Sequence, residues 1–304
     1  MPAGNTCASL LKAAERCDSW PYPSSDVASQ TDEQQLLLKT TLELRLEDGV
    51  TKVGLIVKEV AKLLEEYNSL KESKKETPVF IFSEKYVKFH SELNSEEKRT
   101  LAVREMVDYW REKDCLECLR GWRNETYPVY YTNRVFNDSL AFTLERAASW
   151  AFGVATFGVH VNGYTHDSQT GELKLWVARR SPTKATWPNY LDNTCAGGIS
   201  HGDGVFETVV KECHEEGNIP KELVSKARSA GAVTYTSYTS LGVSPETQYV
   251  YDLELPASFV PAPNDGEVGA FYLMGVDEAI SKLKEGEFKP NCGMGKYASV
   301  HADI

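Results

Sequence analysis

Residues 193–220 read Asn-Thr-Cys-Ala-Gly-Gly-Ile-Ser-His-Gly-Asp-Gly-Val-Phe-Glu-Thr-Val-Val-Lys-Glu-Cys-His-Glu-Glu-Gly-Asn-Ile-Pro. The first half of this stretch contains several glycines, which predict a flexible loop whose backbone can approach a ligand closely. They are Gly197, Gly198, Gly202 and Gly204. Asp203 is a good N-cap residue, so we expect a helix to begin directly after it.

The predicted helix has two different faces. Apolar residues recur at i, i+3, i+4 and i+7, which predicts a stripe that packs on a core. They are Phe206, Val209, Val210 and Cys213. At about 100° per residue, three glutamates fall within about 100° of one another around the opposite side. They are Glu212, Glu215 and Glu216.

Three carboxylates placed in this way repel one another unless a cation lies among them. Oxygen ligands at this density suit Mg²⁺ or Mn²⁺. The alternative is a solvated acidic helix face, which is the usual explanation of a Glu-rich helix. The glycine loop, the N-cap and the neighbouring Lys211 favour the metal-binding interpretation.

The composition of the whole chain excludes several classes of protein. The 304 residues are 41% hydrophobic and 25% charged, which is typical of a soluble protein with one large or two medium domains. The net charge of −11 argues against a protein that mainly binds nucleic acid or an anionic membrane. No run approaches the roughly 20 apolar residues of a membrane-spanning helix. No secretory signal is recognisable, and seven scattered cysteines favour free thiols, so we expect a cytoplasmic location, with organellar targeting left open.

The two halves of the chain differ in pattern. Short strands and amphipathic helices alternate in the first half, which predicts a smaller α+β domain. Longer strands begin near Phe152, with one glycine-opened helix between them and a second near the end; we place these strands at 154–161, 173–179, 233–239, 248–255 and 270–274. This order predicts an α/β fold with a mixed sheet covered on both faces. We therefore expect domains at residues 1–140 and 141–304.

The acidic helix and its loop resemble the Nudix box. Gly197, five residues, Asp203 and seven residues precede Lys211-Glu212-Cys213-His214-Glu215-Glu216-Gly217-Asn218-Ile219, with the spacing of the box intact. Three positions depart from the pattern: Asp203 stands for Glu, Lys211 for Arg and Asn218 for Gly. In the family, the first two brace the loop–helix turn by an ion pair, which Asp and Lys can also form with shorter reach. Asn218 tolerates the left-handed conformation that glycine supplies after a helix.

Further stretches are similar to a two-domain Nudix group whose N-terminal half is related to a segment of thiamine pyrophosphokinase-like proteins. They include Trp20-Pro21-Tyr22-Pro23, Gly121-Trp122-Arg123-Asn124-Glu125, Leu144-Glu145-Arg146-Ala147-Ala148 and Pro263-Asn264-Asp265-Gly266-Glu267-Val268. The resemblance implies a Nudix α/β/α sandwich behind the N-terminal domain.

The resemblance also implies a metal-dependent hydrolase that converts thiamine diphosphate, or its oxidised derivatives, to the monophosphate plus phosphate. Glu212, Glu215, Glu216 and the carbonyl of Gly197 match the family's ligands for Mg²⁺ or Mn²⁺. Two alternatives stay open. One is a hydrolase of ADP-ribose or another nucleoside diphosphate derivative, and the other is a non-catalytic module that binds a diphosphate.

Residues outside the box complete the predicted site. Glu267 is a candidate catalytic base, in competition with Glu212, and Glu216 is also expected in the catalytic set. Basic side chains before Trp187-Pro188 are candidates for holding the terminal phosphate, because guanidinium groups suit phosphate, although a solvated basic turn is an equal alternative. Together with Gly198, the expected substrate-binding residues are Arg179, Arg180 and Lys184.

The remaining expectations concern partners. Trp122 or Tyr235 could stack on a heteroaromatic ring, although most aromatic residues of this chain are expected in the core. The expected partner is a small-molecule diphosphate rather than nucleic acid or membrane. The chain is expected to be a monomer or a homodimer.

Overall fold

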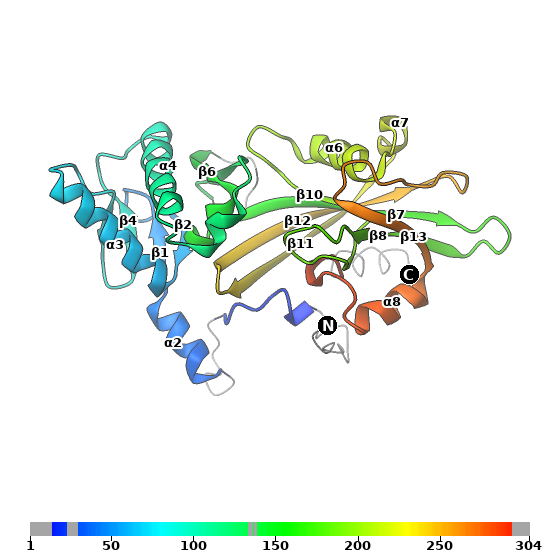
Figure 1. Cartoon of the computed structure of the whole chain (residues 1–304), viewed down its shortest axis with the longest axis horizontal. Coiled ribbons are helices and arrows are strands. Elements are labelled where there is room, and N and C mark those ends of the chain that lie inside the picture. Colours follow the sequence, from blue (N-terminus) through cyan, green and yellow to red (C-terminus); the bar gives the residue numbers. More distant parts are fainter. Residues whose placement is uncertain (1–13, 23–29, 133–135, 137–138, 294–304) are drawn as a thin grey trace. The chain divides into compact units, whose positions relative to one another are not determined.

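A computed structural model describes residues 14–22, 30–132, 136 and 139–293 of the chain. It divides into two compact units. Among the described residues, the N-terminal unit comprises those within 19–156 together with 236–246, and the C-terminal unit comprises 14–18, 157–235 and 247–293. Each unit is described by itself below, and Figure 1 shows the elements of both along the chain.

The N-terminal unit is built on a four-stranded sheet in the order β2-β1-β4-β3. Its strands are β1 (Leu42–Arg45), β2 (Lys52–Ile56), β3 (Phe80–Phe82) and β4 (Tyr86–Phe89), with a separate hairpin of β5 (Thr126–Tyr130) and β6 (Leu140–Glu145). Its helices are α2 (Asp32–Thr40), α3 (Lys58–Ser73), α4 (Glu96–Glu112) and α5 (Ser149–Phe152), with short 3-10 turns η2 (Glu117–Gly121) and η3 (Arg146–Ala148). One apolar core joins these elements, with Leu44, Leu64 and Phe142 fully buried in it.

The C-terminal unit is built on a larger sheet in the order β11-β12-β7-β8-β13. The strands are β7 (Thr156–His166), β8 (Leu173–Arg180), β11 (Arg228–Thr239), β12 (Gly242–Glu254) and β13 (Val268–Gly275). Two short strands lie off this path: β9 (Leu191–Asp192) pairs with β8, and β10 (Cys195–Gly198) pairs antiparallel with β7. Strand β8 pairs antiparallel with β7, β9 and β13, and β10 adds a glycine-containing strand beside β7.

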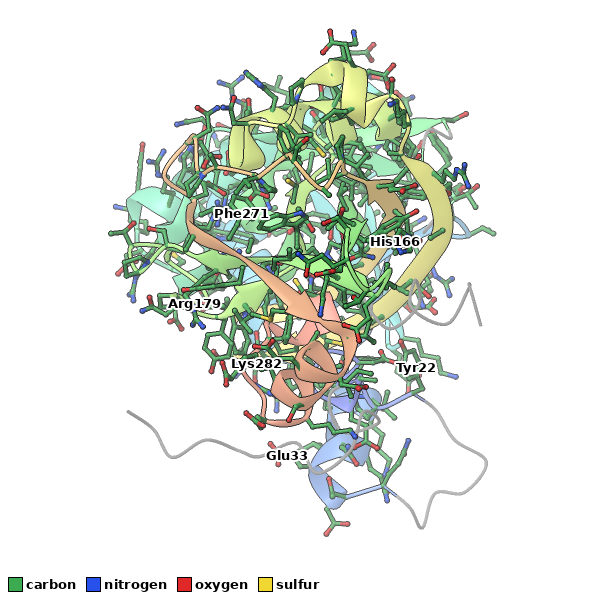
Figure 2. All side chains as sticks on the ribbon, turned by 90° about the vertical axis from the view of Figure 1, so that its right-hand side faces the viewer. Tyr22, Glu33, His166, Arg179, Phe271 and Lys282 are labelled. Carbon is green, nitrogen blue, oxygen red and sulfur yellow. The ribbon has the colours of Figure 1, made fainter. Side chains whose placement is uncertain are left out.

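Helices cover the two faces of this larger sheet. The helix α6 (Val205–Gly217) and the short α7 (Lys221–Val224) lie on one face, and α8 (Val276–Lys284) lies on the other (Figure 1). Beneath α8, a second apolar cluster includes Val177, Met274 and Phe288. Figure 2 shows Lys282 on α8, with Arg179 and Phe271 at the β8–β13 edge. The α/β fold predicted from the sequence is confirmed by this arrangement of a sheet between helices.

Most of the predicted elements exist, but their bounds differ. The five predicted strands of the second half correspond to β7, β8, β11, β12 and β13. The segment predicted as the start of a flexible glycine loop is instead β10, because Gly197 and Gly198 pair in register with Val159 and Gly158. The compact units divide between Thr156 and Phe157, whereas the sequence pattern predicts a domain boundary between residues 140 and 141, at the start of β6. Since β6 pairs with β5, it stays with the N-terminal unit.

Among the described residues, no helix has both the length and the apolar character that a membrane span requires.

Candidate functional site

The helix α6 begins one residue later than the sequence predicted. Its N-cap is Gly204, which makes no side-chain capping bond, so the prediction that Asp203 is the N-cap was wrong. The backbone N–H of Asp203 instead bonds to the carbonyl of Ser200, at 3.1 Å, in the turn before the helix. At the other end, Asn218 is the C-cap in the left-handed conformation, with φ of 50°, as its resemblance to the glycine of the box predicted.

The faces of α6 also differ from the simple prediction. Val209 and Cys213 are fully buried, but Phe206 keeps 38% of its surface exposed. Glu216 is only 7% exposed, although it was placed opposite the apolar stripe. The reason is angular: seven residues after Val209, Glu216 lies about 20° from it around the helix axis, and therefore faces the sheet.

Glu212 lies against the backbone of β10. A Cβ built onto Gly197 would overlap the Glu212 carboxyl group, so the carboxylate occupies the space that a side chain would fill. Gly197 is held in this place by its register with Val159 of β7. The structure therefore brings together Glu212 and Gly197, two of the residues that match the metal ligands of the Nudix box.

Glu216 reaches the same strand one residue earlier. Its Oε2 accepts a hydrogen bond from the backbone N–H of Ala196, at 2.8 Å. Burial raises the pKa of Glu216 well above its usual range, and the charges of Asp192 and Glu212 raise it further. Because no cationic side chain among the described residues pairs with it, Glu216 is a buried carboxylate whose charge is left uncompensated by the protein.

The side chain of Glu215 is exposed, in contrast to that of Glu216. Within the described ranges, no three His, Cys, Asp or Glu side chains are grouped so as to hold a metal ion. The arrangement nevertheless fits a hard divalent cation in part. Glu212 and Glu216 supply carboxylate oxygens beside a strand whose glycine leaves room for them, and oxygen is the donor such cations prefer.

The loop before β13 is tied to the end of α6. The backbone N–H of Ala262 bonds to the carbonyl of Gly217, at 3.1 Å, and Asn264 Nδ2 bonds to the carbonyl of His214, also at 3.1 Å. This docking brings Glu267 close enough for its charge to contribute to the raised pKa of Glu216, after burial and the charges of nearer carboxylates. Glu267 forms an ion pair with Lys184, so the candidate base and one candidate phosphate ligand contact each other.

The two arginines at the end of β8 have different environments. Arg180 pairs with Asp192, Nη1 to Oδ2 at 2.8 Å, and donates to the backbone carbonyls of Thr186 and Trp187 at 3.0 and 3.1 Å. Its donors are thus used inside the fold, against the prediction that Arg180 holds a phosphate. Arg179 is more exposed and donates to the carbonyl of Asn189, at 2.7 Å.

Asp192 is a site residue to which the sequence assigned no role. Burial alone would raise its pKa, but the charges of Lys289 and Arg180 and hydrogen bonds from Cys292 and Arg180 hold the pKa well below its usual range. The thiol of Cys292 donates to Asp192 Oδ1 at 2.6 Å, across one hundred residues of sequence. The sequence contained one signal for this role. Asp192 lies between Leu191 and a run of small, uncharged residues, a pattern typical of a buried segment, and a buried acid needs a charged or hydrogen-bonding partner.

Other predicted residues stay apart from the site. Asp203 and Lys211 form no ion pair in the part of the chain that the structure describes, so the turn is not braced as the box implies. Gly198 pairs with Gly158 inside the sheet. Tyr235 is 1% exposed, with its hydroxyl hydrogen-bonded by Asn291 and Gln248, and is therefore not a stacking surface.

The contrast between the neighbouring arginines gives a stability prediction. The variant Arg180→Met leaves the buried Asp192 carboxylate without its ion-pair partner and should lower the free energy of unfolding by about 3 kcal/mol. Arg179→Met is the matched control and should cost about 1 kcal/mol or less, because its side chain is partly solvated. Thermal denaturation of both variants checks this, and equal melting temperatures would contradict the structural role of Arg180.

Glu216 gives a pH-dependent prediction. Because its pKa is higher in the folded than in the unfolded chain, the folded state binds the extra proton, and stability is lost as the pH rises through this interval. Glu216→Gln keeps an oxygen for the Ala196 N–H and removes the charge. We expect the metal-free variant to melt at a higher temperature than the wild type at about pH 7, with the difference vanishing near about pH 4. If the melting temperature of Glu216→Gln is lower than that of the wild type at both pH values, the charge of Glu216 does not destabilise the folded state.

Two known protein families match successive parts of the chain. The model described as "NUDIX domain" matches residues 156–292, and the model described as "Domain of unknown function (DUF4743)" matches residues 27–156. An uncharacterized protein of Saccharomyces cerevisiae is 40% identical over 191 residues, which cover 59% of this chain and 54% of that protein.

A plant relative and a solved structure extend the comparison. Nudix hydrolase 20, chloroplastic, of Arabidopsis thaliana is 36% identical over 252 residues, which cover 80% of this chain and 63% of the plant protein. The chain thus spans between 54% and 63% of the length of these two curated relatives. The crystal structure of DR0079 from Deinococcus radiodurans aligns with 20% identity and a TM-score of 0.42, covering 57% of this chain and 99% of that one. Residues 156–292 of the chain thus match the NUDIX domain, and residues 27–156 match a domain of the DUF4743 family.

Proposed function

We propose that this protein is a Mg²⁺- or Mn²⁺-dependent hydrolase of the phosphoanhydride bond in a small-molecule diphosphate. The observation that carries the proposal is the placement of Glu212 and Glu216 against the glycine strand β10, inside the segment that matches the NUDIX domain. Relatives named Nudix hydrolases support the reaction class.

The chain's own residues have separable roles in this proposal. Glu212, Glu216 and the Gly197 carbonyl would hold the cation, with the exposed Glu215 as a further oxygen donor at the rim. When bound, a divalent cation neutralises diphosphate oxygens and lowers the pKa of a coordinated water. The Ala196 N–H holds Oε2 of Glu216, which fixes the carboxylate, and Oε1 would be its oxygen for the cation.

Lys184 and Glu267, which form an ion pair, would complete the proposed site. Their ion pair would open when a substrate phosphate takes the Lys184 ammonium, which leaves Glu267 to accept a proton from water. Arg179, with part of its side chain exposed, would contact the terminal phosphate. Arg180 would act indirectly, by keeping Asp192 and the turn after β8 in place.

For the substrate, we propose thiamine diphosphate or its oxidised derivatives, hydrolysed to the monophosphate plus phosphate. The support is the similarity of the flanking stretches to the two-domain Nudix group linked to these compounds. ADP-ribose is the competing substrate within the same reaction class. The DUF4743 match carries no named activity, so it does not favour one over the other.

A non-catalytic diphosphate-binding module is the second candidate function. It is favoured by the unpaired Asp203 and Lys211 and by the exposed Glu215, which leave the cation with fewer fixed ligands among the described residues than the Nudix box implies. Such a module would bind the diphosphate in the presence of Mg²⁺ and release no phosphate.

A substrate panel with carboxylate variants separates these functions. The full-length protein is incubated with Mg²⁺ or Mn²⁺ and with thiamine diphosphate, an oxidised thiamine diphosphate or ADP-ribose, and the released phosphate and monophosphates are measured. We expect turnover that needs the metal and falls by about 10²-fold or more in Glu212→Gln and Glu216→Gln. Glu222→Gln on the exposed side of α7 is the control and should keep full activity. Metal-dependent binding without phosphate release, even with Mn²⁺, would select the binding module.

Gly197 gives a second activity prediction. The methyl group in Gly197→Ala would displace the Glu212 carboxylate, and a shift of about 1 Å in a catalytic group costs about 10²-fold in rate. Gly204→Ala is the matched control, because its methyl group would displace only the exposed Glu207 side chain, which can rotate away. We expect kcat to fall in the first variant and to stay within a few-fold in the second. Equal rates would mean that the position of Glu212 does not matter for turnover.

A further inference from the structure

Three aromatic side chains gather beside the start of α6. Phe206, in the first turn of the helix, keeps 38% of its surface exposed although the sequence pattern placed it in the buried stripe. Its ring lies 6.0 Å from the ring of Tyr251 on β12, centroid to centroid. Tyr251 and Tyr249 are both half-buried. Three aromatic rings, each partly exposed, therefore lie next to the carboxylate helix.

The contacts between β7 and β12 fix which way these tyrosines point. Gly158 lies beside the side chain of Gln248, and Asn162 Nδ2 donates to Asp252 Oδ1 at 3.4 Å. Even-numbered residues of the two strands thus share one face of the sheet. Because side chains alternate along a strand, Tyr249 and Tyr251 point to the opposite face, which is the face that α6 covers. The ring contact of Phe206 with Tyr251 agrees with this assignment.

The register of β7 with β12 also fixes the distance between the aromatic side chains and the carboxylates of α6. Gly158 beside Gln248 and Asn162 beside Asp252 place Val159 beside Tyr249, and Val159 pairs with Gly197 on its other side. Tyr249 is therefore two strand spacings, about 10 Å, from the backbone on which Glu212 rests. This span suits a diphosphate and a short linker between the cation and a ring.

A buried hydroxyl on the same face points independently to a ligand. Thr247 precedes Tyr249 by two residues, so it shares the α6 face, and it is 5% exposed. Its Oγ1 has no hydrogen-bond partner among the residues the structure describes. A buried hydroxyl without a partner costs free energy, and native structures rarely keep one without a reason. A ring heteroatom of a bound ligand would satisfy it.

We propose that Phe206, Tyr249 and Tyr251 form the subsite for a planar heteroaromatic ring of the diphosphate substrate, with Thr247 Oγ1 hydrogen-bonding the ring edge. The inference rests on the proposed function and assigns the residues that select its substrate. A stacked ring gains dispersion and quadrupole attraction from the three aromatic faces. Trp122 and Tyr235, the aromatic residues singled out in the sequence, have no part in it.

The test measures KM for aromatic and non-aromatic diphosphates in four variants of the full chain. Tyr249→Leu, Tyr251→Leu and Thr247→Val alter the subsite, and Phe271→Leu on β13 is the aromatic control. We expect KM for thiamine diphosphate or for ADP-ribose to rise about tenfold in the tyrosine variants. KM for isopentenyl diphosphate, which has no ring, should not change. The substrate whose KM responds identifies the ring that the subsite takes.

Thr247→Val separates recognition from folding. Replacing an unpartnered buried hydroxyl with an isosteric methyl group should leave the melting temperature unchanged or higher, yet raise KM for the aromatic substrate. A purely structural threonine would give the opposite pattern, a lower melting temperature with unchanged KM. Unchanged KM for both aromatic diphosphates in all three subsite variants would overturn the inference while the proposed function stands.

A second measurement covers the case in which the wild type releases no phosphate, which would refute the proposed function. Calorimetric titration of the wild type with thiamine and with adenosine, which carry the rings without a diphosphate, then tests the subsite alone. Binding that is about tenfold weaker in Tyr251→Leu supports the subsite. Binding that is equal in wild type and variant, or absent in the wild type, overturns it.

Discussion

The missing side chain at Gly197 determines how α6 lies on the sheet. Helix and strand can approach closely there because the Glu212 carboxylate takes the space of a Cβ. Neighbouring contacts fix the same register: Glu216 accepts a hydrogen bond from the Ala196 N–H, and the free thiols of Cys213 and Cys195 are hydrogen-bonded to each other. Three successive residues of β10 are thereby matched to one stretch of α6. Any larger residue at the glycine position would displace the Glu212 carboxylate from the strand.

Two buried acids of the C-terminal unit, Asp192 and Glu216, have opposite electrostatic environments. Asp192 and Glu216 are both less than a tenth exposed. Asp192 has cationic neighbours, and its pKa is depressed, whereas Glu216 has acidic neighbours, and its pKa is raised. Groups whose environments push their pKa values apart serve different purposes. The compensated acid stabilises the turn after β8, and the uncompensated acid stores the repulsion that a bound cation would relieve.

The sequence predicted the elements that local pattern determines and failed where distant residues decide. The apolar pattern predicted the five long strands, and apolar residues at helical spacing predicted α6. Strand β10 was missed because Cys195-Ala-Gly-Gly has little strand propensity; its pairing with β7 makes it a strand. Arg180 was read as a phosphate ligand because its partner, Asp192, cannot be recognised as such without the sheet. The environment of Phe206 was also mispredicted, because its ring contacts Tyr251, which lies on the distant strand β12.

Successive side chains of strand β12 point to opposite faces of the sheet, so this one strand contributes residues to both faces. On one face, Gln248 donates to the hydroxyl of Tyr235, which Asn291 also donates to, so the C-terminal segment is held under the sheet. On the other face, Tyr249 lies toward α6. The carboxylates of α6 can recognise only what every diphosphate shares, namely its charge and its cation. Discrimination between diphosphates must come from groups that touch the rest of the molecule, and a strand fixed from below by neutral hydrogen bonds is a rigid support for them.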